Sequence, residues 1–307
     1  MKAVPSARCS LILLSCLLVS ACVSVEVRPE LEERPTRDPA TWHWSVPDPK
    51  PHVTHGVVHS NVMDRDVGYN IYLPPSYSKQ RAMRFPVVYF LHGAGGSEYS
   101  DTSIVDLVIP QIRDGTIGEV IYVFVNGGHY SRYRDNPTTN VMAETYIVRE
   151  LIPAIDSRYR TIADREGRAL FGFSMGGGGA TRLALKYPSM FCAVGSISGS
   201  LDPTPDRGES SLEASAPRPD NIYDWATRNR EQVRNRIGFY FTVGGEETLY
   251  ERHPPFMAHL KSLDIAFNYR VEAGLGHNLG RSSVLFGRDI VAFLDSQYRN
   301  AYVPEIP

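Results

Sequence analysis

One serine lies at the centre of the segment Gly-Phe-Ser-Met-Gly at residues 172–176. An apolar run at residues 169–173 predicts a buried strand, and a helical pattern starts at Met175. A serine on a tight strand-to-helix turn, with glycines two positions away on each side, is typical of a nucleophile elbow. The context predicts that Ser174 is a nucleophile; the alternative is a glycine-rich turn with an idle serine.

A serine hydroxyl becomes a strong nucleophile only when a base accepts its proton. His277 lies in the segment Gly-Leu-Gly-His-Asn at residues 274–278, after the last predicted strand and before the last predicted helix. In chains with a nucleophile elbow the base follows the acid, and glycines let the loop return an imidazole to the serine. His277 is therefore the predicted base among nine histidines; the alternative is an ordinary histidine of a surface loop.

The third group of such a site is a carboxylate that accepts a hydrogen bond from the histidine and fixes its tautomer and orientation. The segment Gly-Gly-Glu-Glu at residues 244–247 follows a predicted strand at residues 239–243. Glu247 is the predicted acid and Glu246 is the alternative, and the preference for Glu247 rests on a family pattern described below. In a third interpretation both glutamates are solvated loop charges.

Acyl transfer by a serine also needs an oxyanion hole, in which backbone amides point at the charge that develops on the substrate oxygen. One amide is expected from Met175, directly after the nucleophile, and the second from the loop after another buried strand. That loop reads His-Gly-Ala-Gly-Gly at residues 92–96, and Ala94 is the predicted donor. His92 is expected to make structural hydrogen bonds and is also a candidate substrate contact.

The elements that must position these residues alternate along the chain from residue 53. An α/β domain with a mainly parallel central sheet flanked by helices follows from this alternation, and the first two strands should form an antiparallel hairpin at one edge. Each candidate residue follows a strand, at the carboxyl edge where such sheets bind ligands. The predicted strands are residues 54–62, 69–73, 86–91, 120–125, 169–173, 193–197, 239–243 and 266–271, and the predicted helices are 105–113, 141–157, 175–186, 255–263 and 282–298.

These motifs resemble the bacterial putative-esterase family, which includes feruloyl and acetylxylan esterases, S-formylglutathione hydrolases of the esterase D type, and mycolyltransferases. The resemblance implies an α/β-hydrolase fold and a serine enzyme that acts on esters or thioesters. It also places the acid at Glu247, three residues after the first glycine of its segment, although the family more often has aspartate there. The matching stretches lie at residues 72–77, 91–96, 150–153, 172–179, 185–188, 191, 198–199 and 276–277.

The sequence specifies the substrate less closely than it specifies the type of reaction. Residues 126–135 follow a predicted strand and should reach the pocket, where Tyr130, Tyr133 and Asp135 would suit a sugar or an aromatic acyl group. A plain surface loop with structural aromatic residues is the alternative. Residues 201–221 are rich in proline, serine and charge, which predicts either a small lid or an excursion without fixed structure.

The N-terminus has the layout of a bacterial export signal. Lys2 and Arg8 precede a short apolar run at residues 11–20, which is too short to span a bilayer. The ending Val-Ser-Ala-Cys resembles a lipobox, so Cys22 is the predicted site of a lipid anchor to the membrane of the bacterial cell envelope; an ordinary signal peptide is the alternative. Residues 23–52 are expected to be a proline-rich tether, and residues 53–300 the catalytic domain.

Composition excludes several other classes of function. The net charge is −2 and the Lys and Arg residues are scattered, which argues against a nucleic-acid partner. No metal-binding motif or phosphate-binding loop is present, so no cofactor is expected. The sequence predicts a serine carboxylic-ester hydrolase that acts on acylated sugars or similar small esters, with two alternatives: an acyltransferase using the same residues, and a catalytically silent lipoprotein that binds the envelope.

Overall fold

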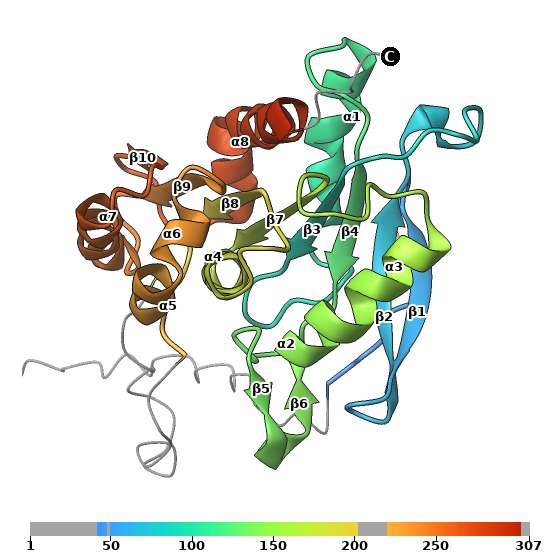
Figure 1. Ribbon diagram of the computed structural model, residues 1–307, viewed down its shortest axis with the longest axis horizontal. Coiled ribbons are helices and arrows are strands. Elements are labelled where there is room, and N and C mark those ends of the chain that lie inside the picture. Colours follow the sequence, from blue (N-terminus) through green and yellow to red (C-terminus); the bar gives the residue numbers. More distant parts are fainter. Residues whose placement is uncertain (1–41, 48–49, 202–219, 302–307) are drawn as a thin grey trace, which may run out of the picture. The chain divides into compact units, whose positions relative to one another are not determined.

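A sheet of eight strands forms the centre of the computed structural model, which describes residues 42–47, 50–201 and 220–301 (Figure 1). The strand order is β1-β2-β4-β3-β7-β8-β9-β10. β2 is antiparallel to both β1 and β4, and all other neighbours are parallel. The strands are β1 (Thr54–Ser60), β2 (Arg65–Tyr72), β3 (Val87–Leu91), β4 (Ile121–Val125), β7 (Arg168–Phe173), β8 (Ala193–Ile197), β9 (Gly238–Gly244) and β10 (Asn268–Glu272).

Helices cover both faces of this sheet, because alternate residues of its buried strands point to opposite sides. In β3, Tyr89 and Leu91 belong to the core under α3, α4, α5 and α7, whereas Val88 and Phe90 belong to the core under α1 and α8 (Figure 1). The helices are α1 (Val105–Arg113), α2 (Ala143–Thr145), α3 (Ile152–Arg158), α4 (Met175–Lys186), α5 (Ile222–Arg228), α6 (Arg230–Val233), α7 (His253–Ser262) and α8 (Leu279–Ala301).

The predicted α/β fold with an antiparallel hairpin at one edge is confirmed, whereas the helix predicted at residues 141–157 differs from the structure. The first two residues of that predicted helix instead form β6 (Val141–Met142). This strand pairs with β5 (Asp135–Asn136) in a short hairpin, and Asn140 in its turn has the left-handed conformation. The predicted helix then contains a π-helical stretch, Tyr146–Leu151, before α3. Pro153 follows that stretch and has no amide hydrogen for the ordinary helical hydrogen bond.

The short helices α5 and α6 were not predicted, because seven and four residues are too few to give a clear helical period. Asn221 starts α5, and its side chain accepts hydrogen bonds from the amides of Tyr223 and Asp224. Of the predicted lid, the structure describes Leu201, Asp220 and Asn221; residues 202–219 lie outside the described part, as do the signal segment and Cys22. None of the described helices, including the 23 residues of α8, is long and apolar enough to cross a membrane.

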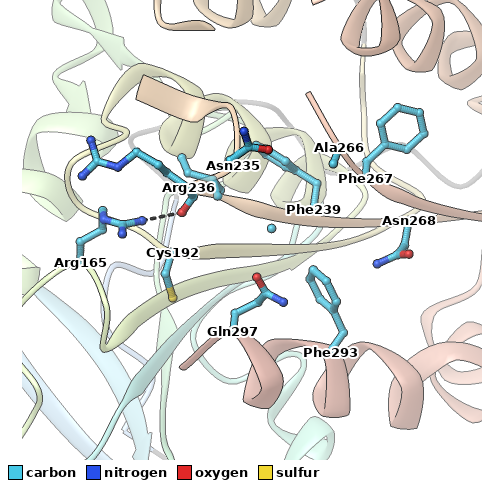
Figure 2. A pocket seen from close by; sticks show the side chains of 12 residues that line it. Arg165, Cys192, Asn235, Arg236, Phe239, Ala266, Phe267, Asn268, Phe293 and Gln297 are labelled. Atoms are coloured by element: carbon cyan, nitrogen blue, oxygen red, sulfur yellow. Dashed lines mark hydrogen bonds between the residues drawn. The ribbon is translucent and has the colours of Figure 1, made fainter. Parts of the chain in front are cut away.

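The strand direction separates the candidate site from a pocket at the other end of the sheet. This pocket of about 480 Å³ is lined by Cys192 before β8, Phe239 at the start of β9, Asn268 at the start of β10, and Phe293 of α8 (Figure 2). Those positions mark the amino ends of parallel strands, whereas Ser174 follows a carboxyl end. Burial raises the pKa of the Cys192 thiol to about 12, so the thiol stays protonated.

Candidate active site

Ser174 occupies a sharp turn between β7 and α4. Its backbone has φ 56° and ψ −117°, an uncommon conformation for a residue with a side chain. The Ser174 amide donates to the Ile197 carbonyl at 2.9 Å, and the Ser174 carbonyl accepts from Gly178 and Ser200. The surrounding backbone therefore holds a strained residue in place, as is common at functional sites.

The glycines around this turn are required by space. A Cβ on Gly176 would lie 1.9 Å from the carbonyl oxygen of Leu91, at the end of β3. A Cβ on Gly172 would lie 2.4 Å from the backbone of Gly176 itself. The amino end of α4 thus packs directly on the neighbouring strand, and only glycine permits this approach.

A continuous chain of hydrogen bonds joins Ser174, His277 and Glu247. The Ser174 hydroxyl lies 2.9 Å from His277 Nε2, and His277 Nδ1 lies 2.7 Å from Glu247 Oε2. Since a carboxylate only accepts, Nδ1 carries the proton and Nε2 is left to accept from the serine. The His277 ring also stacks on Phe173, with ring centroids 4.8 Å apart, which restricts the rotation of the imidazole.

Glu247, rather than Glu246, points into the protein. Its side chain is fully buried, whereas Glu246 is exposed. Besides His277, the Glu247 carboxylate accepts from the Ser198 hydroxyl at 2.6 Å and from the Gly244 amide at 2.7 Å. Burial opposes the charge, but the hydrogen bonds from His277, Ser198 and Gly244 outweigh it and hold the pKa of Glu247 below its usual value.

Ser198 received no role from the sequence, although it lies in one of the family-like stretches. It is fully buried and has φ 51°, a strained value that aims its hydroxyl at Glu247. Its position in the sequence could have indicated this role, because Ser198 directly follows β8, the neighbour of the strand that ends before Ser174. Phe173, which packs on the His277 ring, was likewise hidden, because its contact partner lies 104 residues away in the chain.

Ser198→Ala should lower kcat/KM at neutral pH by about tenfold and shift the acid side of the pH profile upward. The substitution removes a donor that stabilises the charged form of Glu247, so the pKa of Glu247 rises and ionisation is lost at a higher pH. Measuring kcat/KM between about pH 5 and 9 checks this. An unchanged profile in a folded variant would show that Ser198 does not tune the acid.

The predicted oxyanion donors lie on both sides of Ser174. Met175 is the first residue of α4, and a first-turn amide has no acceptor within its own helix. On the other side lie residues 92–96, here called the oxyanion loop; a Cβ on Gly93 would lie 3.5 Å from Ser174 Cβ.

Two of the three glycine amides in the oxyanion loop already have backbone acceptors. Gly95 donates to the His129 carbonyl, and Gly96 donates to the Gly93 carbonyl. Among the residues that the structure describes, the amide of exposed Ala94 has no such acceptor. Its amide is thus available for a substrate oxygen.

Two of the four candidate substrate contacts are buried and act on the protein instead. His92 is 1% exposed; its Nδ1 donates to the Gly93 carbonyl and its Nε2 accepts from the Gly127 amide. Burial lowers the pKa of His92 to about 4, which keeps the ring neutral as this pattern requires. Tyr133 is 0% exposed and donates to the His92 carbonyl. Neither has the accessible surface that the predicted substrate contact needs, so both instead support the oxyanion loop.

The other two candidates differ from each other. The Asp135 carboxylate accepts from the amide and the hydroxyl of Thr145, so it joins β5 to α2. Tyr130 is half-buried and lies beside the oxyanion loop, where its hydroxyl would be 3.8 Å from a Cβ on Gly95. Tyr130 therefore remains the candidate with a position suited to substrate. No three His, Cys, Asp or Glu side chains in the described part of the chain are arranged to hold a metal ion.

Comparison with known proteins decides the family. The family model described as Putative esterase matches residues 60–265, which is more than half of the chain. The chain belongs to this family. The match includes Ser174 and Glu247 and ends before His277.

The curated relatives of this member of the Putative esterase family are longer proteins, and the match covers only part of each of them. Esterase Rv1288 of Mycobacterium tuberculosis is 33% identical over 172 residues, which are 54% of this chain and 34% of that protein. The endo-1,4-beta-xylanase/feruloyl esterase of Xylanibacter ruminicola is 35% identical over 138 residues, which are 42% of this chain and 19% of that protein. The chain thus spans about a third or less of the length of these relatives.

Solved structures match this chain over most of its length. A ferulic acid esterase has a TM-score of 0.70 and 25% identity, and the match covers 80% of this chain and 98% of that chain. The S-formylglutathione hydrolase from Agrobacterium tumefaciens has a TM-score of 0.65 and 19% identity, covering 80% of this chain and 95% of that chain. The second likeness concerns the fold alone, and both are α/β-hydrolases in architecture.

Proposed function

We propose that this protein is a serine carboxylic-ester hydrolase in which Ser174 is the nucleophile, His277 the general base and Glu247 the acid. The observation that carries the proposal is the hydrogen-bonded chain from the Ser174 hydroxyl through both nitrogens of His277 to the buried Glu247. Its distances of 2.9 and 2.7 Å are within reach for proton transfer. Family membership supports the same reaction class.

The reaction follows from where the protons lie. His277 Nε2 takes the proton of Ser174 as its oxygen attacks the ester carbonyl, and Glu247 stabilises the imidazolium that forms. The amides of Met175 and Ala94 would stabilise the negative charge on the carbonyl oxygen of the tetrahedral intermediate. The imidazolium then gives its proton to the departing alcohol, which leaves an acyl group on Ser174. Water, activated by the same imidazole, releases the acid and restores the serine.

We infer that the substrates are acyl esters of sugars, with feruloyl as the first acyl group to test. The relative and the solved structure named as feruloyl esterases support this choice. Tyr130, half-buried next to the oxyanion loop, offers an aromatic surface on which a sugar or an aromatic acyl ring can stack.

The test is hydrolysis of p-nitrophenyl esters, feruloylated and acetylated sugars, and thioesters, with product analysis in the presence and absence of an alcohol acceptor. Free acid as the main product in both conditions supports a hydrolase. Acyl transfer to the alcohol in preference to water would instead make the protein an acyltransferase. No turnover of any ester, together with no reaction of Ser174 with a fluorophosphonate probe, would leave the envelope-binding lipoprotein.

We also propose that Cys22 carries a lipid that holds the enzyme on the membrane of the bacterial cell envelope. Cys22→Ser should abolish metabolic labelling by palmitate and release the protein from membranes, because the thiol is the acceptor of the lipid. Cys16→Ser, within the apolar run of the same leader, is the matched control and should keep both the label and the membrane location. Labelling that persists in Cys22→Ser would refute the anchor.

A further inference from the structure

Residues 42–46, here called the N-terminal clamp, are fastened to the domain by hydrogen bonds. The Gly68 amide donates to the Trp44 carbonyl at 2.7 Å, and the Val46 amide donates to Glu98 Oε1 at 2.7 Å. At the start of the segment, Trp42 Nε1 donates to Asn126 Oδ1 at 3.0 Å. These contacts join a segment expected to be tether to three separate parts of the domain.

Glu98 and Asn126 form the buried centre of this attachment. They are 0% and 1% exposed, and Asn126 Nδ2 donates both to Glu98 Oε2 at 2.7 Å and to the His43 carbonyl at 3.0 Å. A Cβ on Gly68 would lie 2.2 Å from Glu98 Oε1, so β2 leaves room for this carboxylate. A buried carboxylate without its donors is strongly destabilising. The clamp satisfies Glu98 through Val46, which favours the docked state.

The N-terminal clamp also packs against the segment that supports the oxyanion loop. Residues 126–130, here called the His129 loop, follow β4; in them the Gly127 amide donates to His92 Nε2 at 3.2 Å, and the His129 carbonyl accepts from the Gly95 amide at 2.9 Å. Trp42 stacks on the His129 ring with centroids 4.6 Å apart and planes 18° apart, and Tyr130 stacks on it at 4.1 Å. The clamp, the His129 loop and the oxyanion loop therefore pack in sequence toward Ser174.

We propose that the N-terminal clamp positions the oxyanion loop, with Trp42 as the positioning residue that acts through His129. An oxyanion hole stabilises charge only when its donors are held in place before the reaction. The oxyanion loop contains three glycines and Gly95 has φ 78°, so its own backbone provides little stiffness. The bond from Gly95 to the His129 carbonyl fixes it, and Trp42 fixes His129. This inference rests on the proposed esterase function.

The test is Trp42→Ala in the full mature chain, assayed with p-nitrophenyl acetate and p-nitrophenyl ferulate. We expect kcat to fall roughly 10- to 100-fold by the same factor for both esters, and KM to stay within about threefold, since the oxyanion hole acts in the transition state. Trp42→Phe keeps a ring on His129 and should restore most of kcat. Pro47→Ala, at an exposed position just after the clamp, is the control expected to match wild type.

Amide hydrogen exchange of the oxyanion loop gives a readout that needs no turnover. Exchange at Gly95 should be faster in Trp42→Ala and unchanged in Pro47→Ala, because the Gly95 amide loses a fixed acceptor. Wild-type kcat together with wild-type exchange would overturn the proposal. So would a loss confined to the KM of the ferulate, which would make Trp42 a direct contact of the acyl ring. If wild type hydrolyses no ester, the proposed function fails by itself, and exchange still decides the clamp.

Discussion

Ser174→Ala will lower kcat roughly 10⁴-fold or more and leave the fold intact. The substitution removes the Ser174 hydroxyl, which lies 2.9 Å from His277 Nε2 and is the group that this nitrogen deprotonates, so acyl-enzyme formation stops. Alanine keeps the Cβ that already tolerates the unusual φ of 56°, and the bonds at this turn come from the backbone. The thermal midpoint should therefore change by no more than about 3 °C, in line with a change that removes no buried packing.

Steady-state kinetics, thermal unfolding and labelling by a fluorophosphonate probe measure this outcome. The variant should take up no label, whereas Ser103→Ala, at an exposed serine elsewhere on the surface, should label and turn over as wild type does. Turnover close to wild type in folded Ser174→Ala would show that Ser174 is not the nucleophile.

Glu247→Gln should lower kcat/KM by about 10³-fold, whereas Glu246→Gln should stay within about threefold of wild type. The first change is nearly isosteric, and its effect comes from proton positions. The carboxylate accepts on one oxygen from His277 and on the other from Ser198 and the Gly244 amide. A glutamine has one acceptor oxygen and one amino group to place at these two positions.

Both orientations of that glutamine harm the site. If its oxygen faces His277, its NH2 group lies against the fixed Gly244 amide, and two donors meet where a 2.7 Å hydrogen bond was. If its oxygen faces Gly244, the NH2 group requires the unprotonated nitrogen of His277 at Nδ1. The proton then sits on Nε2, which can no longer accept from Ser174. The exposed Glu246 side chain has no such role.

Measurement of kcat/KM for the two glutamine variants, with thermal unfolding as a check of folding, shows which glutamate is the acid. The pair is well matched because the positions are adjacent and the substitution is the same. A larger loss in Glu246→Gln than in Glu247→Gln would move the acid by one residue. Equal, small losses in both would show that His277 works without a carboxylate partner.

The sequence alone determined the nucleophile motif, the candidate base and the α/β fold. These features are written in short segments: apolar runs long enough for buried strands, and glycines at positions 172 and 176 where the turn leaves no room for a Cβ. The order of strands and helices follows from local periodicity, and the handedness of their connections limits the topologies. Local patterns therefore predicted which residues could do chemistry and at which edge of the sheet they would meet.

Only the tertiary structure decided which polar groups surround those residues. The choice between adjacent Glu246 and Glu247 depends on which side chain turns toward Ser198, 49 residues earlier in the chain. His92 and Tyr133 are buried by packing against each other, and Trp42 reaches Asn126 across 84 residues. Such contacts depend on register and packing between distant elements, which a single sequence does not encode in any local period. Burial, which sets each pKa and separates substrate contacts from structural supports, is therefore a property of the assembled fold.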